Sequence, residues 1–338
     1  MNYIGSKLSL LPFLENVYHQ VADGNEKVFC DIFAGTGAVG RHFKRLGLKV
    51  IANDIQYYAY ALNKAYLEIS RPPSFSRIRG LRKRNVKSVL SLLNQLDGVE
   101  GFISENYGPA GGRMYYTAEN ASKADAIRLQ LEEWREEKRL TEREYYYLLC
   151  SLIEAVDEVA NTASVYGAYL KRFKKTARRD LTLKPLQLIK HVSGCKAWNL
   201  NALELVRRID CDILYLDPPY NQRQYGANYH VLETVAAYDA PRLRGITGMR
   251  EYHRSDFCRK GTAKRAMRDM IVAARTKHIL VSYNDEGVMS LDDIQQLLSL
   301  RGTPRIFKTG HTRFKADAGR RYKRDRTTEF VHYVRVVR

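Results

Sequence analysis

The stretch of sequence that decides the fold is Val28-Phe29-Cys30-Asp31-Ile32-Phe33-Ala34-Gly35-Thr36-Gly37. It begins as a largely apolar run that favours a β-strand, and it ends in two glycines. Apolar residues then recur at helical spacing over residues 39–46, Lys49–Ala52 has the pattern of a second strand, and Tyr57–Glu68 has that of a helix. The order strand, helix, strand, helix predicts the start of a parallel, doubly wound α/β sheet.

The loop after the first predicted strand has the composition of a nucleotide site. Gly35-Thr36-Gly37-Ala38-Val39-Gly40 matches G-x-G-x-x-G, and Asp54 follows the second predicted strand. Glycines let the backbone approach a ligand closely, and an acid accepts hydrogen bonds from ribose hydroxyls. The pattern fits a dinucleotide or any other adenosine-bearing cofactor. A tight turn without a ligand, with Asp54 as a helix N-cap, stays open as the alternative.

The middle of the chain has a different character. Arg71-Pro72-Pro73 ends the helical pattern, and strand signals are then sparse up to about residue 190. Ala118–Arg139 has the pattern of an amphipathic helix, and Thr141 with Glu144 predicts a capping box at the start of the next helix. These signals indicate a helical block inserted into an α/β domain.

The sheet pattern resumes late in the chain, with strands expected at Asp212–Leu216, Ile279–Tyr283 and Phe330–Val337. We therefore expect residues 1–69 and 193–338 to form one α/β domain and residues 70–192 to form the insertion.

A second candidate site follows the strand Asp212–Leu216. Asp217-Pro218-Pro219-Tyr220 stands at its carboxyl end, where ligands bind in open α/β sheets. The prolines lack N–H groups, so the carboxylate and the neighbouring carbonyl are both hydrogen-bond acceptors. An exocyclic amine has two N–H donors to match them, and Tyr220 can stack on the ring that carries the amine. A proline-rich strand exit with a capping Asp is the purely structural alternative.

The net charge of +19 is concentrated in three stretches. Residues 71–87, 171–184 and 301–326 hold 24 of the 56 Lys and Arg residues but only three acids, so the rest of the chain is nearly neutral. Basic patches of this kind indicate a polyanionic partner, most often nucleic acid, although a solvated basic surface is the alternative.

Composition excludes several classes of protein. The 45% hydrophobic content supports a core, no apolar run is long enough for a membrane helix, and the first residues do not have a signal-peptide pattern. The five cysteines are scattered, without C-x-x-C pairs, so neither a disulfide framework nor a metal site is expected. We expect an intracellular protein without membrane association.

Several motifs in order resemble one enzyme family. Tyr3-Ile4-Gly5-Ser6-Lys7, the glycine loop, Asn53-Asp54, a helical insertion and Asp217-Pro218-Pro219-Tyr220 resemble the Dam-like, alpha-class adenine-N6 DNA methyltransferases. Within that class the chain is most similar to the restriction–modification methyltransferases of FokI and NlaIII type. Asn161–Lys171 and Asp217–His230 also look like that group, so the resemblance covers nearly the whole chain.

The resemblance implies a seven-stranded, mostly parallel Rossmann-like methyltransferase sheet with a helical target-recognition insertion. It implies S-adenosylmethionine as cofactor, with Asp54 on the ribose. Asn201 stands where the family usually has an Asp, so that contact departs from the family pattern. The cofactor-binding residues implied are Tyr3, Gly5, Lys7, Asp31, Phe33, Gly35, Gly37, Asp54, Asn201 and Asp217.

The implied reaction needs no covalent nucleophile. Asp217 and the Pro218 carbonyl would hold the amine of a flipped-out adenine, with Pro219 and Tyr220 completing the catalytic motif. Mixed Tyr, Arg, Lys and Gln segments are candidates for contacts to double-stranded DNA, although each also has the pattern of a surface loop or helix end. The candidates are Arg113, Tyr115, Tyr116, Tyr166, Tyr169, Lys171, Arg172, Arg223, Gln224 and Tyr225.

Three rival functions are weighed against this one. A nicotinamide-dependent dehydrogenase would explain the glycine loop and Asp54, but not Asp217–Tyr220 or the basic patches. An RNA or other amino-methyltransferase more often has Asn in place of Asp217. A DNA-binding protein without catalysis would have a broken motif, and this one is intact. We expect a monomer that acts on nucleoid DNA, with a restriction endonuclease for the same site as its companion.

Overall fold

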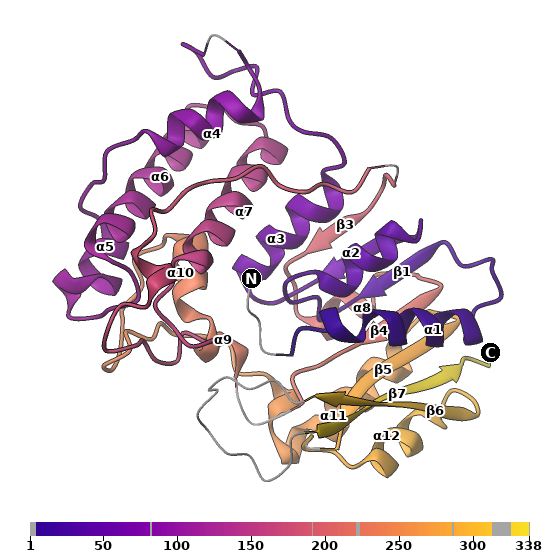
Figure 1. Cartoon of the computed structure of the whole chain (residues 1–338). Coiled ribbons are helices and arrows are strands. Elements are labelled where there is room, and N and C mark those ends of the chain that lie inside the picture. The colour runs from indigo at the N-terminus through magenta and orange to yellow at the C-terminus, as the bar shows by residue number, and fades with distance from the viewer. Residues whose placement is uncertain are drawn as a thin grey trace. The chain divides into compact units, whose positions relative to one another are not determined.

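The structure is a computed structural model that describes residues 5–81, 83–190, 192–220, 224–285, 287–312 and 326–337. The chain divides into two compact units (Figure 1). The sheet unit contains residues 5–63, 192–225 and 253–337, and the helical unit contains residues 64–190 and 226–252. The domain boundaries expected from the sequence stay a prediction.

A seven-stranded sheet forms the centre of the sheet unit, in the order β3-β2-β1-β4-β5-β7-β6. The first five strands are parallel, and β7 is antiparallel to both β5 and β6. This confirms the predicted mixed α/β sheet. The strands are β1 (Val28–Asp31), β2 (Lys49–Asn53), β3 (Lys196–Trp198), β4 (Ile213–Leu216), β5 (His278–Asn284), β6 (Pro304–Thr312) and β7 (Arg326–Arg335).

The central strands β1, β4 and β5 are almost wholly buried because their side chains pack against helices on the sheet. Their apolar side chains join those of α11 and α12 in one core cluster that includes Leu214, Ile279, Met267 and Ile294. The helices of this unit are η1 (Leu8–Leu10), α1 (Leu11–Val21), α2 (Ala38–Arg45), α8 (Ala202–Val206), η4 (Asp256–Cys258), α11 (Lys260–Ala273) and α12 (Leu291–Leu298).

The order in which strands are added to the sheet reverses between β1 and β4. From β1 the chain adds β2 and then β3 on one side, whereas β4 and β5 lie on the other. Cys30 on β1 is therefore paired with Ile51 on one side and with Leu214 on the other. Ligands of open α/β sheets bind at such a switch point, beyond the carboxyl ends of the strands.

The helical unit is built around α7, most of whose side chains are buried. The predicted capping box is confirmed: Thr141 Oγ1 accepts from the Glu144 amide, and the Glu144 carboxylate accepts from the Thr141 amide. The helices are α4 (Val86–Asn94), α5 (Phe102–Tyr107), η2 (Pro109–Gly111), α6 (Ala118–Glu136), α7 (Glu142–Glu158), η3 (Lys175–Arg178) and α10 (His230–Ala237). Two more, α3 (Tyr57–Glu68) and α9 (Tyr225–Asn228), have residues in both units.

Some boundaries differ from those expected. Helix α6 ends at Glu136 rather than Arg139, because Lys138 has a left-handed φ of 56°. Strands β3 and β6 were not predicted, since β3 has three residues and β6 lies within a basic stretch. No helix among the described residues is long and apolar enough to cross a membrane.

Candidate active site

The glycine loop after β1 has a conformation that requires glycine. Gly35 and Gly37 have left-handed φ angles of 50° and 76°. A Cβ atom on Gly37 would lie 2.6 Å from Asn63 Oδ1. Asn63 in turn supports the loop, because its Nδ2 donates to the Gly35 carbonyl at 2.9 Å. The loop is thus a preformed turn that presents its backbone at the carboxyl end of β1.

Asp54 ties this loop to the start of α3. Its Oδ2 accepts from the Gly35 amide at 2.8 Å, and its Oδ1 accepts from the Gln56 amide at 2.9 Å. Asp54 therefore does cap the start of α3, which was the structural alternative considered for it from the sequence. Each carboxylate oxygen has a second lone pair, so a ribose hydroxyl as a further donor is compatible with this geometry.

Asp217-Pro218-Pro219-Tyr220 follows β4, which is the neighbour of β1. Two of its carbonyls have partners: the Cys258 thiol lies 3.8 Å from the Pro219 oxygen, and the Val288 amide donates to the Tyr220 oxygen at 2.8 Å. The Pro218 carbonyl accepts no hydrogen bond from the residues that the structure describes. Asp217 and Pro218 therefore offer two adjacent acceptors at the switch point.

Lys7 brings a buried positive charge to this motif. Its Nζ lies 3.2 Å from Asp217 Oδ1 and 3.6 Å from Glu329 Oε2, and the three side chains are 4%, 16% and 8% exposed. Nζ also lies 5.5 Å from the centre of the Tyr220 ring. Burial alone would lower the pKa of Lys7, but the carboxylates of Asp217 and Glu329 outweigh it and raise that pKa. Lys7 is therefore charged at every physiological pH.

Burial raises the pKa of Asp217 to about 6, with Lys7 acting to lower it and Glu329 to raise it. Burial, with Asp217 and Asp54 nearby, also raises the pKa of Asp31 well above its usual range. Carboxyl groups with raised pKa values that gather where strands end are typical of functional sites.

Several buried acceptors near these strand ends accept no hydrogen bond from the residues that the structure describes. They are Asp31 Oδ1, Asn63 Oδ1 and Glu329 Oε2, the last of which has only the ion pair with Lys7. Buried polar atoms are normally satisfied, so a ligand with donor groups fits this edge of the sheet. The sequence interpretation missed Glu329, whose only signal was one acid in a terminal strand that is otherwise largely apolar.

The comparisons with known proteins agree with this geometry. A family model described as "D12 class N6 adenine-specific DNA methyltransferase" matches residues 3–297. The chain is 43% identical over 338 residues to the type II methyltransferase M.NlaIII of Neisseria lactamica, and the match covers 98% of both chains. It is 42% identical to the modification methylase StsI of Streptococcus sanguinis and 40% identical to the type II methyltransferase M.FokI of Planomicrobium okeanokoites. These two matches span 88% and 94% of this chain, but only 46% and 50% of the relatives.

The chain belongs to the D12 class of N6 adenine-specific DNA methyltransferases. This confirms the resemblance and the expectation of an adenine-specific DNA methyltransferase, and it leaves no place for the dehydrogenase alternative. DNA is thus the substrate class of the enzyme.

Other residues that the sequence predicts at the cofactor make contacts within the protein. Phe33 packs edge-on against Phe257 at 5.1 Å between ring centres. Asn201 caps α8 by accepting from the Leu203 amide at 2.9 Å, so its side chain has a structural partner. A Cβ on Gly5 would lie 2.5 Å from the Tyr225 hydroxyl oxygen. Tyr3, predicted at the cofactor, lies outside the described residues.

Three of the tyrosines predicted as DNA contacts are buried in the structure. Tyr115, Tyr116 and Tyr166 are 0% exposed. Tyr115 donates to the Tyr166 carbonyl at 2.7 Å, and Tyr166 donates to Asp157 at 3.0 Å. The Tyr115 ring stacks on that of Tyr166 and meets that of Tyr107 edge-on, so these rings form part of the core of the helical unit.

Arg113 is also occupied within the methyltransferase, since its guanidinium donates to backbone carbonyls of residues 106, 245 and 246. Its predicted role as a DNA contact stays a prediction. Tyr169 is half-buried, whereas Lys171 and Arg172 are exposed and compatible with DNA contact. Gln224 accepts from the Ser255 amide at 2.9 Å, Tyr225 is half-buried, and Arg223 lies outside the described residues.

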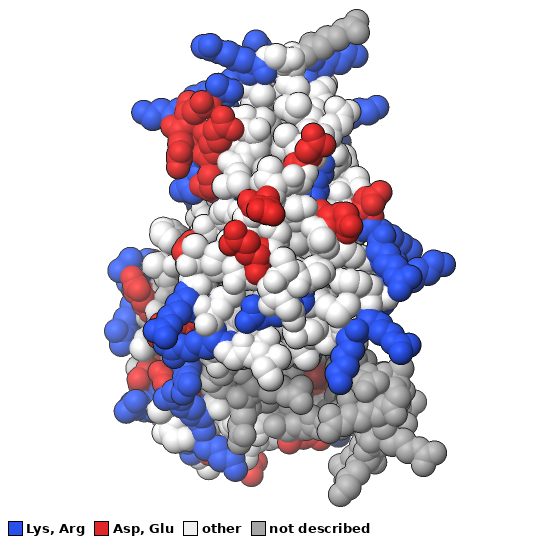
Figure 2. All heavy atoms as spheres, turned by 90° about the vertical axis from the view of Figure 1, so that its left-hand side faces the viewer, with Lys and Arg blue, Asp and Glu red and all other residues white. Residues whose placement is uncertain are grey.

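Most described Lys and Arg residues of the three basic stretches are exposed. Figure 2 shows Lys and Arg side chains mainly along the margins of the face that it displays, with Asp and Glu in several groups between them. All described Lys and Arg residues of 71–87 are exposed, as are Lys171 and Arg172. Arg301 is different, because it donates to the carbonyls of Ile271, Val272 and Ala274. Half of the stretch 301–326, residues 313–325, lies outside the described residues.

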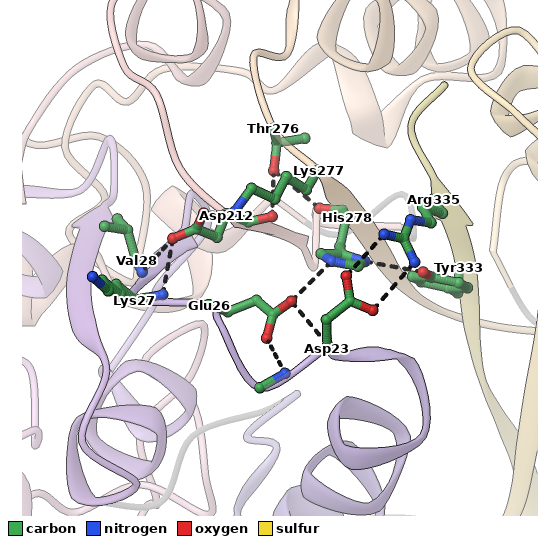
Figure 3. Close-up of polar contacts among 11 residues, drawn as sticks. Asp23, Glu26, Lys27, Val28, Asp212, Thr276, Lys277, His278, Tyr333 and Arg335 are labelled. Atoms are coloured by element: carbon green, nitrogen blue, oxygen red, sulfur yellow. Dashed lines mark hydrogen bonds and ion pairs between the residues drawn. The ribbon is translucent and has the colours of Figure 1, made fainter. Parts of the chain in front are cut away.

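A second polar cluster lies at the amino ends of the strands (Figure 3). Asp23, Glu26 and His278 have ligand atoms within 4.8 Å of one another, close enough to hold a metal ion. Each already has a protein partner: Arg335 binds Asp23, the Asp23 and Gly24 amides donate to Glu26, and the Tyr333 hydroxyl lies 2.9 Å from His278 Nδ1. The geometry is that of a structural clamp between strands.

Proposed function

We propose that this methyltransferase transfers a methyl group from S-adenosylmethionine to the N6 amine of an adenine within a short double-stranded DNA sequence. The observation that carries the proposal is the pair of acceptors at the switch point, Asp217 and the Pro218 carbonyl, beside the glycine loop. The family supports adenine N6 as the acceptor, and the acceptor pair supports an amine as the reacting group.

Asp217 and Pro218 would activate the amine by hydrogen bonding. The N6 lone pair of adenine is delocalised into the ring, so the amine is a poor nucleophile. When Asp217 and Pro218 each accept one N–H, the lone pair becomes localised on nitrogen and aims away from the ring. This requires Asp217 to be ionised, and the charged Lys7 at 3.2 Å favours that form.

S-adenosylmethionine supplies an electrophilic methyl group when it is bound. The glycine loop would let its nucleoside approach the backbone, and Asp54 would accept from the ribose. The Asp31 and Asn63 oxygens that accept no hydrogen bond from described residues would be satisfied by donor groups of the ligand. The remaining proposed contacts are Tyr3, Gly5, Lys7, Phe33 and Asn201, together with Asp217 itself.

The adenine must leave the duplex to reach Asp217, because its amine is paired inside the helix. Tyr220, half-buried and 5.3 Å from Tyr283 between ring centres, is the proposed stacking partner. Tyr169, Lys171, Arg172, Arg223, Gln224 and Tyr225 remain the proposed DNA contacts. Exposed Lys and Arg would neutralise phosphates and make binding salt-dependent.

The relatives' names support a biological setting. StsI is named a modification methylase, and M.NlaIII and M.FokI are named type II methyltransferases. We propose that this chain likewise modifies the DNA of its own cell, in the nucleoid, as a monomer. A restriction endonuclease that cuts the same unmodified sequence would be its companion.

A methyl-transfer assay tests this function. The protein is incubated with methyl-labelled S-adenosylmethionine and duplex DNA from a host that lacks adenine methylation, and the product is digested to nucleosides. Label in N6-methyladenine supports the proposal. Label only in another nucleoside contradicts it, as does transfer to RNA but not to DNA in a parallel reaction.

A further inference from the structure

A tight hairpin in the helical unit has a backbone that side chains hold in place. Arg244 and Met249 pair as an isolated antiparallel bridge, with N–H to O distances of 2.8 and 2.9 Å. The four residues between them form the turn. Gly245 and Gly248 have left-handed φ angles of 68° and 65°, which glycine adopts without strain. We call residues 244–249 the tip hairpin.

Every carbonyl of the four turn residues faces a polar side-chain atom from elsewhere in the unit. Backbone carbonyls of an exposed turn normally point to water, so this arrangement fixes the turn from the protein side. The contacts are Arg113 Nη2 to Gly245 O (3.3 Å), Arg113 Nε to Ile246 O (2.9 Å), His230 Nε2 to Thr247 O (3.0 Å) and Tyr107 Oη to Gly248 O (3.0 Å). The Tyr115 hydroxyl, whose proton is shared with the nearer Tyr166 carbonyl, lies 3.1 Å from Thr247 O.

The groups that hold the turn are themselves fixed. Tyr107, Tyr115 and His230 are 0% exposed, so their positions are set by core packing. A Cβ on Gly248 would lie 2.7 Å from Arg113 Nε, which leaves no room for a side chain between the turn and the guanidinium. The turn has therefore lost its conformational freedom before any partner binds.

This rigid turn presents an apolar side chain to solvent. Ile246 is 84% exposed, more than any other large apolar side chain in the described parts of the chain. Arg242 and Arg244 beside it are also exposed. The only acid of residues 239–250, Asp239, is held by Arg250 through two hydrogen bonds of 2.9 and 2.6 Å. The tip therefore combines an exposed apolar side chain with two exposed arginines.

We propose that Ile246 is a wedge that enters the base stack of bound duplex DNA, with Arg242 and Arg244 on the adjacent phosphates. A single exposed apolar side chain is ordinary on protein surfaces. A held backbone and flanking cations are what favour duplex DNA, because DNA-bending proteins insert Ile, Leu or Phe between base steps while cations neutralise phosphates. This inference rests on the proposed function and adds to it a residue that helps to open the duplex.

The wedge is tested with Ile246→Ser, and Leu129→Ser is the matched control, because Leu129 is a 45% exposed residue of α6 in the same unit. The parent protein first defines the methylated sequence by sequencing of modified bases. Duplexes with that sequence then carry 2-aminopurine in place of the target adenine, so that fluorescence reports its unstacking. KM and kcat are measured with the unsubstituted adenine duplex, and the thermal unfolding midpoint is measured on the same protein preparations.

We expect Ile246→Ser to raise KM for the duplex about tenfold and to reduce the fluorescence increase, since a buried apolar contact is lost. A mismatch opposite the target should restore much of the rate of Ile246→Ser, because an unpaired base is easier to extrude. Ile246→Phe should behave like the parent, and Leu129→Ser should change nothing.

Equal KM and fluorescence for Ile246→Ser and the parent would overturn the wedge. So would a change in oligomeric state of Ile246→Ser with unchanged DNA kinetics, since the tip hairpin would then bind a second copy. These results are distinct from a failure of the proposed function, in which the parent protein itself transfers no methyl group to DNA.

Discussion

The Lys7 ammonium lies 3.2 Å from the Asp217 carboxylate, and both are shielded from water at the end of the central sheet. Glu329, on a strand far along the chain, lies 3.6 Å from the same ammonium. One buried cation thus faces two buried carboxylates. The ionisation of Asp217 is therefore set by three groups, and pH becomes a probe of the site.

The first prediction concerns the pH dependence of methyl transfer. In the proposed function Asp217 acts as a carboxylate, and its pKa is raised from 3.8 to about 6. A raised pKa means that the proton is retained to higher pH, so activity should fall as pH drops through about 6. Initial rates at saturating cofactor between pH 5 and pH 8 measure this. Full activity down to about pH 4, the range of an ordinary Asp, would contradict it.

The second prediction is that substitutions of Glu329 and Lys7 shift the pKa of Asp217 in opposite directions. Glu329→Gln removes a negative charge that raises the pKa of Asp217, so the acidic limb of the rate profile should move to lower pH. Lys7→Met removes the positive charge that lowers this pKa, so its limb should move to higher pH. The groups that face this cluster are Asp31, Tyr215, Tyr220 and Tyr225, and they are unchanged in both variants.

A purely structural role for Lys7 and Glu329 would reduce the rate of each variant without moving either limb. The thermal unfolding midpoint of both variants serves as the control for folding. Limbs that shift in the same direction in the two variants would contradict the charge argument.

The third prediction concerns the glycine loop. Gly37→Ala places a Cβ 2.6 Å from Asn63 Oδ1 and requires a left-handed φ of 76°. Such a conformation costs an L-residue about 1–2 kcal/mol. We expect S-adenosylmethionine binding, measured by calorimetry, to weaken by about tenfold or more. Gly47→Ala, where φ is 95° and no atom lies within 4 Å of the new Cβ, is the control for backbone strain alone.

The fourth prediction concerns stability. Asp212 Oδ2 accepts from the Lys27 and Val28 amides at 2.9 Å each, which links the start of β1 to that of β4. Asp212→Ala should lower the free energy of unfolding by about 1–3 kcal/mol, because two amides lose a charged acceptor. Urea unfolding at pH 7 measures this, and Asp210→Ala, at an exposed neighbouring acid, is the control.

The pKa of Asp212 lies below its usual 3.8: burial would raise it, but Lys277 and the two amides outweigh burial. The folded state therefore favours the carboxylate, and this stabilisation is present above about pH 4 and is lost as pH falls through the lower folded pKa. The difference between parent and Asp212→Ala should accordingly shrink at acid pH. A difference that stays constant from pH 7 to pH 3 would contradict this assignment.

Elements that depend on residues close together in the sequence could be predicted from it. The capping box at Thr141 and the helix Tyr57–Glu68 are examples. Asp217 and the glycine loop could be placed together because parallel neighbouring strands end at the same edge of a sheet.

Other features depend on contacts between residues distant in sequence. The pairing of Lys7 with Glu329 could not be predicted, because the sequence around either residue contains no pattern that points to the other. Tyr115 and Tyr166 look like surface aromatics in sequence, yet their hydroxyls find buried partners and the rings become core. Likewise, the sequence around Arg113 is typical of a DNA contact, whereas in the structure its guanidinium donates to carbonyls of the tip hairpin.

The most direct test of the central claim is sequencing of modified bases in DNA from a methylation-free host that expresses either the parent protein or Asp217→Ala. We predict N6-methyladenine at one short sequence with the parent and none with the variant, while the purified variant still binds the same duplex. N6-methyladenine at that sequence in cells that express Asp217→Ala would contradict the assignment of Asp217 to the reacting amine.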